Sequence, residues 1–339
     1  MNRHYVEGSS VADVARRTTD LIVKDGENVN RRVGNWCMMR DEYQTIRELH
    51  NVTLKVTNPM ARWSERVNDG ILTEMLDYSL ALNPGFTHHG SWNFYDQWRT
   101  VGMELYPYAY GTRIWGENPS DIDQWNEVVK ILCRDKTSRH ASITIHRPID
   151  RLREFQPCTF QFHWSINKDG KLDMTTMMRS QDALRGLWLD LFSYSVLHEQ
   201  MCFATNIPIG EYTHFECNVH IYESDFSKVD SSWAKPDDPY QHGIIGCPAD
   251  FLDIEMKRRV YNCLGTLYKD GDIMGAFAEA DGLSPYWRSA LRFLIISVYF
   301  SKKKVKQATD YSWGYEQAKG CHVADIKWCL QKFLEKKKS

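Results

Sequence analysis

Apolar and polar residues alternate with the period of β-strands in the middle of the chain. The alternation is clear in HASITIHRP at 140–148 and in THFECNVHIYES at 213–224. Between them, CTFQFHWSINKDGKLDMTTMMRS at 158–180 alternates on both sides of the turn-forming tetrapeptide NKDG. Because successive side chains of a strand point to opposite faces, the pattern predicts strands, and the NKDG turn predicts that two of them form a hairpin.

Helical spacing of apolar residues marks three further segments. PSDIDQWNEVVKILCRD at 119–135 has one apolar face, with Ser120 as the expected N-cap. LWLDLFSYSVLHEQMCFAT at 187–205 is apolar on nearly all sides, which predicts a buried helix. DGILTEMLDYSLALNP at 69–84 predicts a helix that ends at Asn-Pro, and Glu74 lies beside its apolar stripe, either on a solvated face or buried with a raised pKa.

The two ends of the chain differ from this middle part. KDGENVNRRVGN at 24–35 predicts a polar loop, which could grip an anion or be a plain solvated turn. From about residue 245 the chain is rich in lysine and aromatic residues with helical patterns, and its SKKKVK run is typical of a solvated helix end. We therefore expect an α/β domain over 1–245 and a mainly helical extension over 246–339 that packs on this core.

Composition limits the classes of function. A 42% hydrophobic fraction over 339 residues can fill a sizeable core, and a formal net charge of −2 gives no basic field for nucleic acid, although a few arginines could still hold a small anion. The nine cysteines include no C-x-x-C pair, so neither a disulfide framework nor a zinc site is expected. The longest apolar run, at 291–300, is too short to span a membrane, and the amino terminus lacks the pattern of a signal peptide. We expect a soluble protein of the cytoplasm, or of the host cytoplasm if it is viral.

Cys158 is the candidate nucleophile. It follows proline in FQPCTFQF, where a cysteine is either a small buried hydrophobe or a reactive thiol. A reactive thiol needs a nearby cation that lowers its pKa, and Arg179, on the other strand of the hairpin, could provide one. The sequence has no dinucleotide-binding, P-loop, H-E-x-x-H or G-x-S-x-G motif, and its twelve histidines are scattered, so no metal cofactor is expected.

Five segments, taken in order, carry a resemblance to a known family. They are YAYGTRIWG at 108–116, DKTSRHASI at 135–143, QPCTFQF at 156–162, MRSQDALRGLWLDLFSY at 178–194 and NVHIY at 218–222. They resemble five segments of the thymidylate synthase superfamily. The first three match its Tyr-Gly segment ending in Trp, its Asp-Ser-Arg-Arg element and its Pro-Cys nucleophile motif. The fourth matches its strand-turn-helix segment, which carries Arg-Ser, Asp and Gly, and the fifth matches its His-x-Tyr strand. This superfamily includes the pyrimidine nucleotide hydroxymethylases. The resemblance runs from about residue 65 to residue 225.

The resemblance implies an α/β fold with a mixed sheet packed with helices, an obligate homodimer with shared active sites, and a covalent mechanism. The thiolate of Cys158 would add to C6 of a pyrimidine nucleoside monophosphate, and C5 would then attack the one-carbon group of 5,10-methylenetetrahydrofolate. In thymidylate synthase a hydride from the folate completes a methyl group, whereas in the hydroxymethylases water adds instead.

The resemblance also implies roles for the matched residues. Arg179 and Ser180 would hold the nucleotide phosphate together with Arg139 of the partner subunit. Glu74 would be the general acid/base. The other matched positions would contact the nucleotide or the folate: His220 and Tyr222 at the ribose 3′-hydroxyl, Arg32 or its neighbour Arg31 at the phosphate, Asp182 and Gly186 on the floor shared by both ligands, and Trp98 and Tyr95 beside the folate.

Asp190 bears on the choice of base. Family members that read uracil have an asparagine at the matched position, because a neutral amide both donates to O4 and accepts from N3–H. Cytosine presents an acceptor at N3 and a donor at N4, and a carboxyl group can share a proton with N3 and accept from the N4 amine. Asp190 therefore favours dCMP or CMP and a 5-hydroxymethylase. The alternatives are a methyl-forming enzyme on dCMP or dUMP and an inactive homologue that binds nucleotides or RNA.

Four places depart from the family pattern. His140 stands at the second arginine of the Arg-Arg pair, Thr159 at a histidine that follows the nucleophile, and His163 where a glutamine is usual. The strand before the ribose contact reads FECN at 215–218 instead of a glycine-rich sequence. The loss of the second arginine predicts a weaker or rearranged grip on the phosphate.

Overall fold

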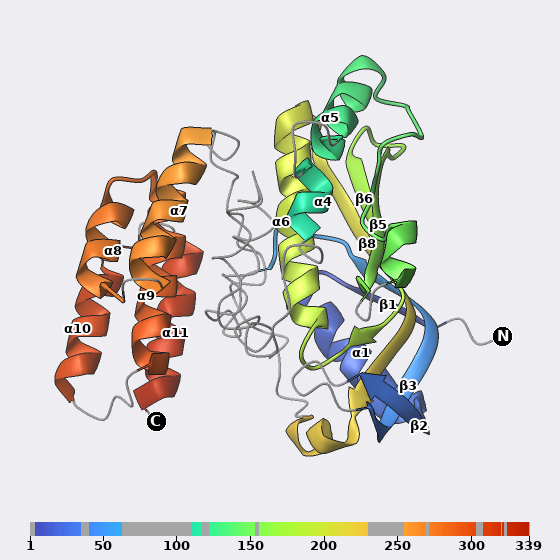
Figure 1. Cartoon of the computed structure of the whole chain (residues 1–339), viewed down its shortest axis with the longest axis horizontal. Coiled ribbons are helices and arrows are strands. Elements are labelled where there is room, and N and C mark those ends of the chain that lie inside the picture. The colour runs from blue at the N-terminus through green and yellow to red at the C-terminus, as the bar shows by residue number, and fades with distance from the viewer. Residues whose placement is uncertain are drawn as a thin grey trace.

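A mixed sheet of eight strands forms the centre of the part of the chain that the structure describes (Figure 1). The structure is a computed structural model and describes residues 4–34, 41–62, 110–116, 122–152, 156–229, 254–268, 271–302, 308–319, 321 and 324–338. The strand order is β1-β3-β8-β6-β5-β4, with β2 beside β3 and β7 beside β8. The strands are β1 (Tyr5–Gly8), β2 (Glu27–Gly34), β3 (Asp41–Val56), β4 (Ser142–Thr144), β5 (Thr159–Ile166), β6 (Leu172–Met178), β7 (Gln181–Asp182) and β8 (Ile209–Tyr222).

Helices from distant parts of the chain cover one face of this sheet. They are α1 (Val11–Asp25), α4 (Tyr110–Trp115), α5 (Gln124–Arg134) and α6 (Leu187–Thr205). Because α6 lies against β8 and also contacts α1 and α5, most of its residues are buried, which explains its apolar sequence. Among the described residues, no α-helix covers the opposite face of the sheet (Figure 1).

The hairpin of β5 and β6 brings two functional candidates together. The strands pair antiparallel from Ile166 and Leu172 at the turn to Thr159 and Met178 at the open end. Cys158 and Arg179, the next residues along each strand, are therefore neighbours, and the backbone N–H of Arg179 donates to the carbonyl of Cys158 at 2.8 Å.

The predicted α/β class, the hairpin, the short strand within 140–148 and the helix at 187–205 are confirmed. Two predictions of local structure are wrong. The segment 24–35 contains strand β2, because its backbone pairs along the whole of its length with β3. Helix α5 begins after Asp123, whose side chain accepts from the backbone N–H of Asn126, so Asp123 and not Ser120 is the N-cap. The helix predicted at 69–84 lies outside the described residues.

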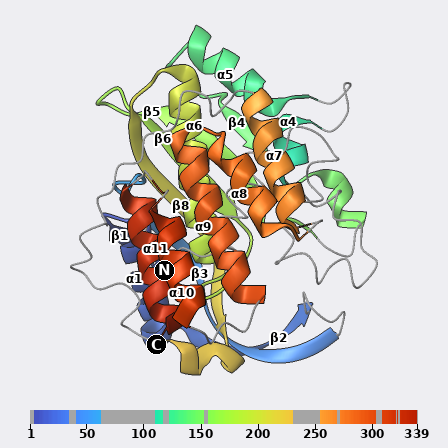
Figure 2. The same cartoon turned by 90° about the vertical axis from the view of Figure 1, so that its left-hand side faces the viewer.

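The carboxy-terminal part is helical, as predicted. It consists of α7 (Ile254–Tyr268), α8 (Ile273–Asp281), α9 (Pro285–Lys302), α10 (Ala308–Ala318) and α11 (Ala324–Lys338). These helices pack on one another, with α9 in contact with the other four. They form a group apart from the sheet in Figure 1, and they lie in front of the sheet in the view of Figure 2. The boundary at residue 245 lies outside the described residues, and the packing of this extension on the core stays a prediction.

Candidate active site

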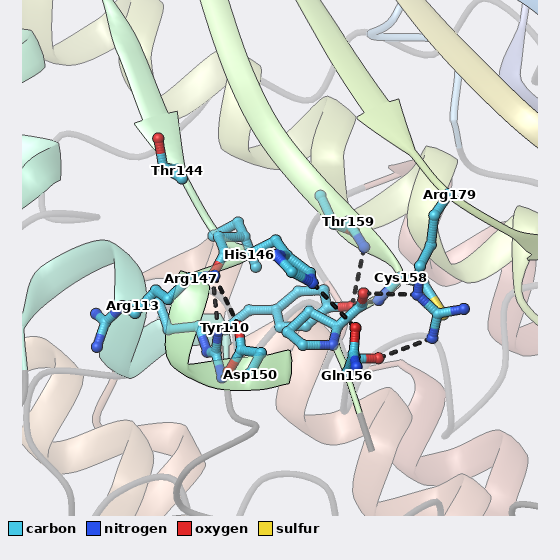
Figure 3. Close-up of polar contacts among 12 residues, drawn as sticks. Tyr110, Arg113, Thr144, His146, Arg147, Asp150, Gln156, Cys158, Thr159 and Arg179 are labelled. Atoms are coloured by element: carbon cyan, nitrogen blue, oxygen red, sulfur yellow. Dashed lines mark hydrogen bonds and ion pairs between the residues drawn. The ribbon is translucent and has the colours of Figure 1, made fainter. Parts of the chain in front are cut away.

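Cys158 immediately precedes strand β5, at a point where polar groups from several elements meet (Figure 3). The hydroxyl oxygen of Tyr110, from α4, accepts hydrogen bonds from the backbone N–H groups of Cys158 at 3.0 Å and Thr159 at 3.3 Å. From the other strand, Arg179 donates through Nε to the carbonyl of Pro157 at 3.0 Å and through its guanidinium to the carbonyl of Gln156 at 2.9 Å. The backbone around the thiol is thus fixed from both sides.

The thiol of Cys158 is half-buried and its electrostatic surroundings are mixed. Burial raises the pKa of Cys158 to about 11, the charge of Arg179 lowers this pKa, and the charges of Asp190 and Glu216 raise it. The charge of Arg179 thus lowers the pKa of this thiol, in the direction that the sequence predicted, but burial and two carboxyl groups leave the pKa raised, and the activating role of Arg179 stays a prediction.

A buried ion pair supports the segment that leads to Cys158. Arg113 of α4 contacts both carboxylate oxygens of Asp150 at 2.6 and 2.8 Å and donates to the carbonyl of Ile145 at 2.7 Å. The backbone N–H of Arg147 donates to the same carboxylate at 2.7 Å. Because both partners are buried, the pair fixes residues 145–150 against α4, beside Tyr110 (Figure 3).

Asp190 lies in the first turn of α6 and joins a network that reaches Cys158. The side-chain amide of Gln181 donates to its carboxyl group at 2.6 Å, and Tyr194, one turn later on α6, also bonds to it. The hydroxyl of Tyr194 lies 2.7 Å from that of Thr159, the residue after the nucleophile. Burial raises the pKa of Asp190, whereas Gln181, the nearby His214 and Tyr194 lower it.

A second group of matched residues lies where β7 meets β8. Asp182 stands beside His220 in the parallel pairing of these strands, and the backbone N–H of Ala183 donates to the carbonyl of His220 at 2.8 Å. Tyr222 packs edge-on against His220, with ring centroids 5.1 Å apart, and the guanidinium of Arg185 lies 5.2 Å from the Tyr222 ring. Burial raises the pKa of Asp182 to about 6 and lowers that of His220 to about 4.

Glu48 of β3 extends this group to the hairpin of β2 and β3. Its buried carboxylate contacts Arg31 of β2, accepts from the side-chain amide of Asn218 at 2.7 Å and lies 2.9 Å from Nε2 of His50. Asn218 in turn lies 3.0 Å from Nδ1 of His220. Although burial raises the pKa of Glu48, the hydrogen bonds from Arg31, Asn218 and His50 lower it to about 2, so this carboxyl group is ionised at neutral pH.

Residues 21–256, more than half of the chain, match the family model described as thymidylate synthase. The protein belongs to the thymidylate synthase family. Members of this family transfer a one-carbon unit from methylenetetrahydrofolate to a pyrimidine nucleotide, so the protein is a one-carbon transferase of this kind. The fold described above, with its mixed sheet and covering helices, is a thymidylate synthase-like fold with a helical carboxy-terminal region.

In this thymidylate synthase fold, the residues that the resemblance selected fall into three sets. One set lies together around the open ends of β6, β7 and β8: Cys158, Arg179, Ser180, Asp182, Gly186, Asp190, His220 and Tyr222. Arg139 is exposed in the segment before β4, away from this set. Glu74, Tyr95 and Trp98 lie outside the described residues, and Arg32 is placed only by its backbone in β2.

The sequence analysis missed several residues of this site. Tyr110 belonged to the quoted YAYGTRIWG segment, but nothing in its spacing indicated a contact with the backbone of the nucleophile. Gln181 and Tyr194 were unmarked neighbours of Asp190. The FECN departure was the one signal for Glu216, which is fully buried. Within the described residues, no group of three or more His, Cys, Asp or Glu side chains could hold a metal ion, and no helix could cross a membrane.

Proposed function

We propose that the protein is a pyrimidine nucleotide 5-hydroxymethyltransferase that acts on dCMP or CMP. The observation that carries this proposal is the surroundings of Asp190. Its carboxyl group is half-buried, burial raises its pKa, and it accepts a hydrogen bond from Gln181 within the network that leads to Cys158. A carboxyl group with a proton can donate to N3 of cytosine and accept from the N4 amine. Once that proton has passed to N3, the carboxylate accepts from both N3–H and the N4 amine, whereas it has no donor for the O4 acceptor of uracil.

In the proposed reaction the sulfur of Cys158 bonds to C6 of the ring. The C5=C6 electron pair then becomes C4=C5, and the N3=C4 pair moves onto N3, which takes the proton of Asp190. C5 is thereby made a carbon nucleophile. Tyr110 and Arg179 hold the backbone on both sides of the sulfur, so the thiol is placed before the substrate binds. Among the residues that the structure describes, we assign Arg179, at the open end of β6, to the nucleotide phosphate.

Asp182 is the proposed contact for the pterin ring of the folate. One carboxylate oxygen, Oδ1, accepts from the backbone N–H groups of Leu184 at 2.8 Å and Arg185 at 3.0 Å, and the other, Oδ2, lies 3.7 Å from Nε of Arg185. A carboxyl group held in this way is a suitable acceptor for the amide and amine of a pterin ring. Methylenetetrahydrofolate supplies the one-carbon unit. Gly186, four residues after Asp182, and Glu74 complete the proposed assignment on the basis of the resemblance.

The nature of the product tests the proposal. Purified protein is incubated with methylenetetrahydrofolate and dCMP or CMP, and the nucleotide is analysed by mass spectrometry while absorbance follows dihydrofolate. A gain of CH2O without dihydrofolate is expected. A gain of CH2 with dihydrofolate would instead favour the alternative, a methyl-forming enzyme on dCMP or dUMP. The inactive homologue predicts no change of the nucleotide at all and no effect of Cys158→Ala, a substitution that we expect to abolish turnover.

We also propose that the protein acts as a homodimer that shares its active sites. Two observations support this. The uncovered face of the sheet carries half-buried apolar side chains, such as Met177, Phe215 and Cys217. Ser142 of β4 pairs with His163, which lies five residues along the chain from Cys158. Arg139 lies beyond Ser142, so roughly 17 Å or more separate the backbone of Arg139 from Cys158 of the same chain.

Mixed dimers test this sharing. Cys158→Ala and Arg139→Ala proteins are each expected to be nearly inactive. When the two are unfolded together and refolded, the mixed dimer has one site with both native residues, and about a quarter of wild-type activity should return, because half of the dimers are mixed and each has one intact site of two. Failure of activity to return, with each variant folded, would contradict a site completed across the dimer.

A further inference from the structure

A chain of hydrogen bonds behind His220 determines which of its two ring nitrogens carries the proton. Strands β3 and β8 pair antiparallel, with Glu48 opposite His220 and His50 opposite Asn218, so these four side chains lie on one face of the sheet. Glu48 and His220 are buried and Asn218 is half-buried. Polar groups that pack this closely must match donors with acceptors, which fixes the role of each partner in turn.

The chain of hydrogen bonds starts at Glu48, which only accepts. Arg31 donates to both of its carboxylate oxygens, and Nε2 of His50 lies 2.9 Å from Oε1. These contacts contribute to the low pKa of Glu48, about 2, so the group is ionised at neutral pH. Its Oε2 therefore accepts the hydrogen bond from the side-chain amide nitrogen of Asn218 at 2.7 Å.

The amide of Asn218 passes this polarity on to His220. Because its nitrogen donates to Glu48, its oxygen faces the ring of His220 and lies 3.0 Å from Nδ1. The reverse orientation would set the amide oxygen against a carboxylate oxygen, so that two acceptors would be in contact. An amide oxygen only accepts, so Nδ1 of His220 carries a proton and donates it. Burial lowers the pKa of His220 to about 4, so at neutral pH the ring has this one proton only.

The other ring nitrogen of His220 is then a bare acceptor. Among the residues that the structure describes, none bonds to Nε2, which leaves this nitrogen for a ligand. Tyr222, two residues later on β8, packs edge-on against the same ring. These are the two side chains that the resemblance assigns to the ribose 3′-hydroxyl. A hydroxyl can donate to Nε2, whereas an esterified oxygen or a fluorine at the same carbon cannot.

We propose that Glu48 and Asn218 fix the proton of His220 on Nδ1, so that Nε2 accepts from a free 3′-hydroxyl and the site selects mononucleotides over nucleotides joined through their 3′-oxygen. In an internal residue of a polynucleotide this oxygen carries a phosphate and has no proton to donate. Glu48 and Asn218 are thus positioning residues that act through His220. The contact with the sugar rests on the nucleotide substrate of the proposed function, whereas the position of the proton on His220 does not.

Nuclear magnetic resonance of the ligand-free protein locates this proton directly. In protein with isotope-labelled histidine, Nε2 correlates with both carbon-bound ring protons and Nδ1 mainly with one of them, which identifies the protonated nitrogen. The His220→Gln variant assigns the signals of His220 by their loss. At pH 7 we expect the proton on Nδ1. A proton on Nε2 in wild type would overturn the proposal.

Two variants test the roles of Glu48 and Asn218. Asn218→Leu removes the acceptor for Nδ1, so signals of His220 with its proton on Nε2 should appear. The double variant Glu48→Gln with Asn218→Asp reverses the donors: the glutamine amide donates to the new carboxylate, which again accepts from Nδ1–H, so the wild-type signals should return. Thermal unfolding checks that each variant folds. An unchanged spectrum of His220 in folded Asn218→Leu would contradict the proposal.

Asn126→Leu is the matched control. The amide of Asn126 also donates to a carboxylate, that of Asp123, at 2.6 Å, but this pair is exposed at the start of α5. The control should leave both the signals of His220 and the binding of nucleotides unchanged. A change as large as that in Asn218→Leu would mean that the effect on His220 is not specific to the buried amide.

Binding of 3′-fluoro nucleotides connects the proton of His220 to the sugar. Fluorine is close in size to a hydroxyl group but cannot donate. Calorimetry should show that wild type binds dCMP about tenfold or more tightly than its analogue with fluorine in place of the 3′-hydroxyl. This preference should shrink severalfold in Asn218→Leu, because the freed ring can then donate from Nε2, and it should return in the double variant.

The same two ligands built on uracil keep this proposal apart from the choice of base. A hydroxyl preference seen with dUMP and its fluoro analogue, in a protein that does not bind dCMP, would uphold the selection at the sugar and reject the cytidylate substrate. Equal affinity for the hydroxyl and fluoro nucleotides, or a preference that Asn218→Leu leaves unchanged, would overturn the selection at the sugar and leave the assignment of the base intact.

Discussion

Replacement of Glu48 by glutamine should weaken the fold in a pH-dependent way. The carboxylate of Glu48 holds Arg31, Asn218 and His50, and it joins the hairpin of β2 and β3 to the strand that carries His220. A carboxyl group whose pKa falls from 4.5 to about 2 on folding contributes at most about 3.4 kcal/mol at neutral pH. Arg31 and His50 are about half exposed, so solvent screening reduces the expected loss in Glu48→Gln to about 1–2 kcal/mol.

The sign of the pH dependence follows from the lowered pKa. The contribution is fully present above the pKa of the unfolded group, near 4.5, and is lost as the pH falls through about 2. Urea unfolding of wild type and Glu48→Gln should therefore give free energies of unfolding that differ at pH 7 and converge between pH 4.5 and 2. Glu211→Gln, which breaks the more exposed pair with Lys55, should change the free energy of unfolding by less than about 0.5 kcal/mol. A difference between wild type and Glu48→Gln that persists at the same size to the acid end would refute this account of Glu48.

Three further predictions concern the surroundings of Cys158. Arg179→Gln removes the cation that lowers the Cys158 pKa, so alkylation of Cys158 by iodoacetamide at pH 8 should slow about tenfold. Mass spectrometry follows the reaction, with exposed Cys133 as the internal reference. An unchanged rate would exclude the electrostatic role of Arg179. Arg113→Met leaves Asp150 as an unpaired buried carboxylate and should lower the free energy of unfolding by about 3–5 kcal/mol, whereas Lys130→Met at an exposed pair should change it little; equal effects of the two would contradict the burial argument. Tyr110→Phe removes the acceptor of two backbone N–H groups and should cost about 1–3 kcal/mol with a loss of kcat, and a variant with native stability and kcat would show that these bonds do not place the nucleophile.

The sequence predicted those elements whose periodicity is strong. The hairpin at 158–180 alternates cleanly on both sides of its turn, and the helix at 187–205 is apolar over its whole length, so tertiary contacts had little to override. Strand β2 was missed because its residues are polar and its evidence is the backbone pairing with β3, which no local pattern shows. Helix α1 was missed because Thr18 and Thr19 look polar in the sequence but are buried, each with its hydroxyl donating to a carbonyl one turn earlier.

The candidate site likewise has residues that the sequence could bring together and residues that it could not. Cys158 and Arg179 could be paired from the sequence because the hairpin register makes them neighbours. The contacts of Asp190 with Gln181 and Tyr194, and the position of Glu216 beneath them, depend on how α6 packs on β8, and no spacing in the chain encodes that arrangement. The resemblance supplied the identity of Asp190, and the structure supplied the reason for its raised pKa, which is the burial of its carboxyl group, opposed by Gln181, His214 and Tyr194.

The most direct test of the central claim is tritium release from C5. Labelled CMP, dCMP and dUMP are each incubated with the protein and methylenetetrahydrofolate, and the released tritium is counted. The account predicts release from a cytidine nucleotide, little release from dUMP, and none from any of the three with Cys158→Ala. Release from dUMP alone would contradict the assignment of Asp190 as the cytosine-reading residue and would make this protein a uridylate-specific member of its family.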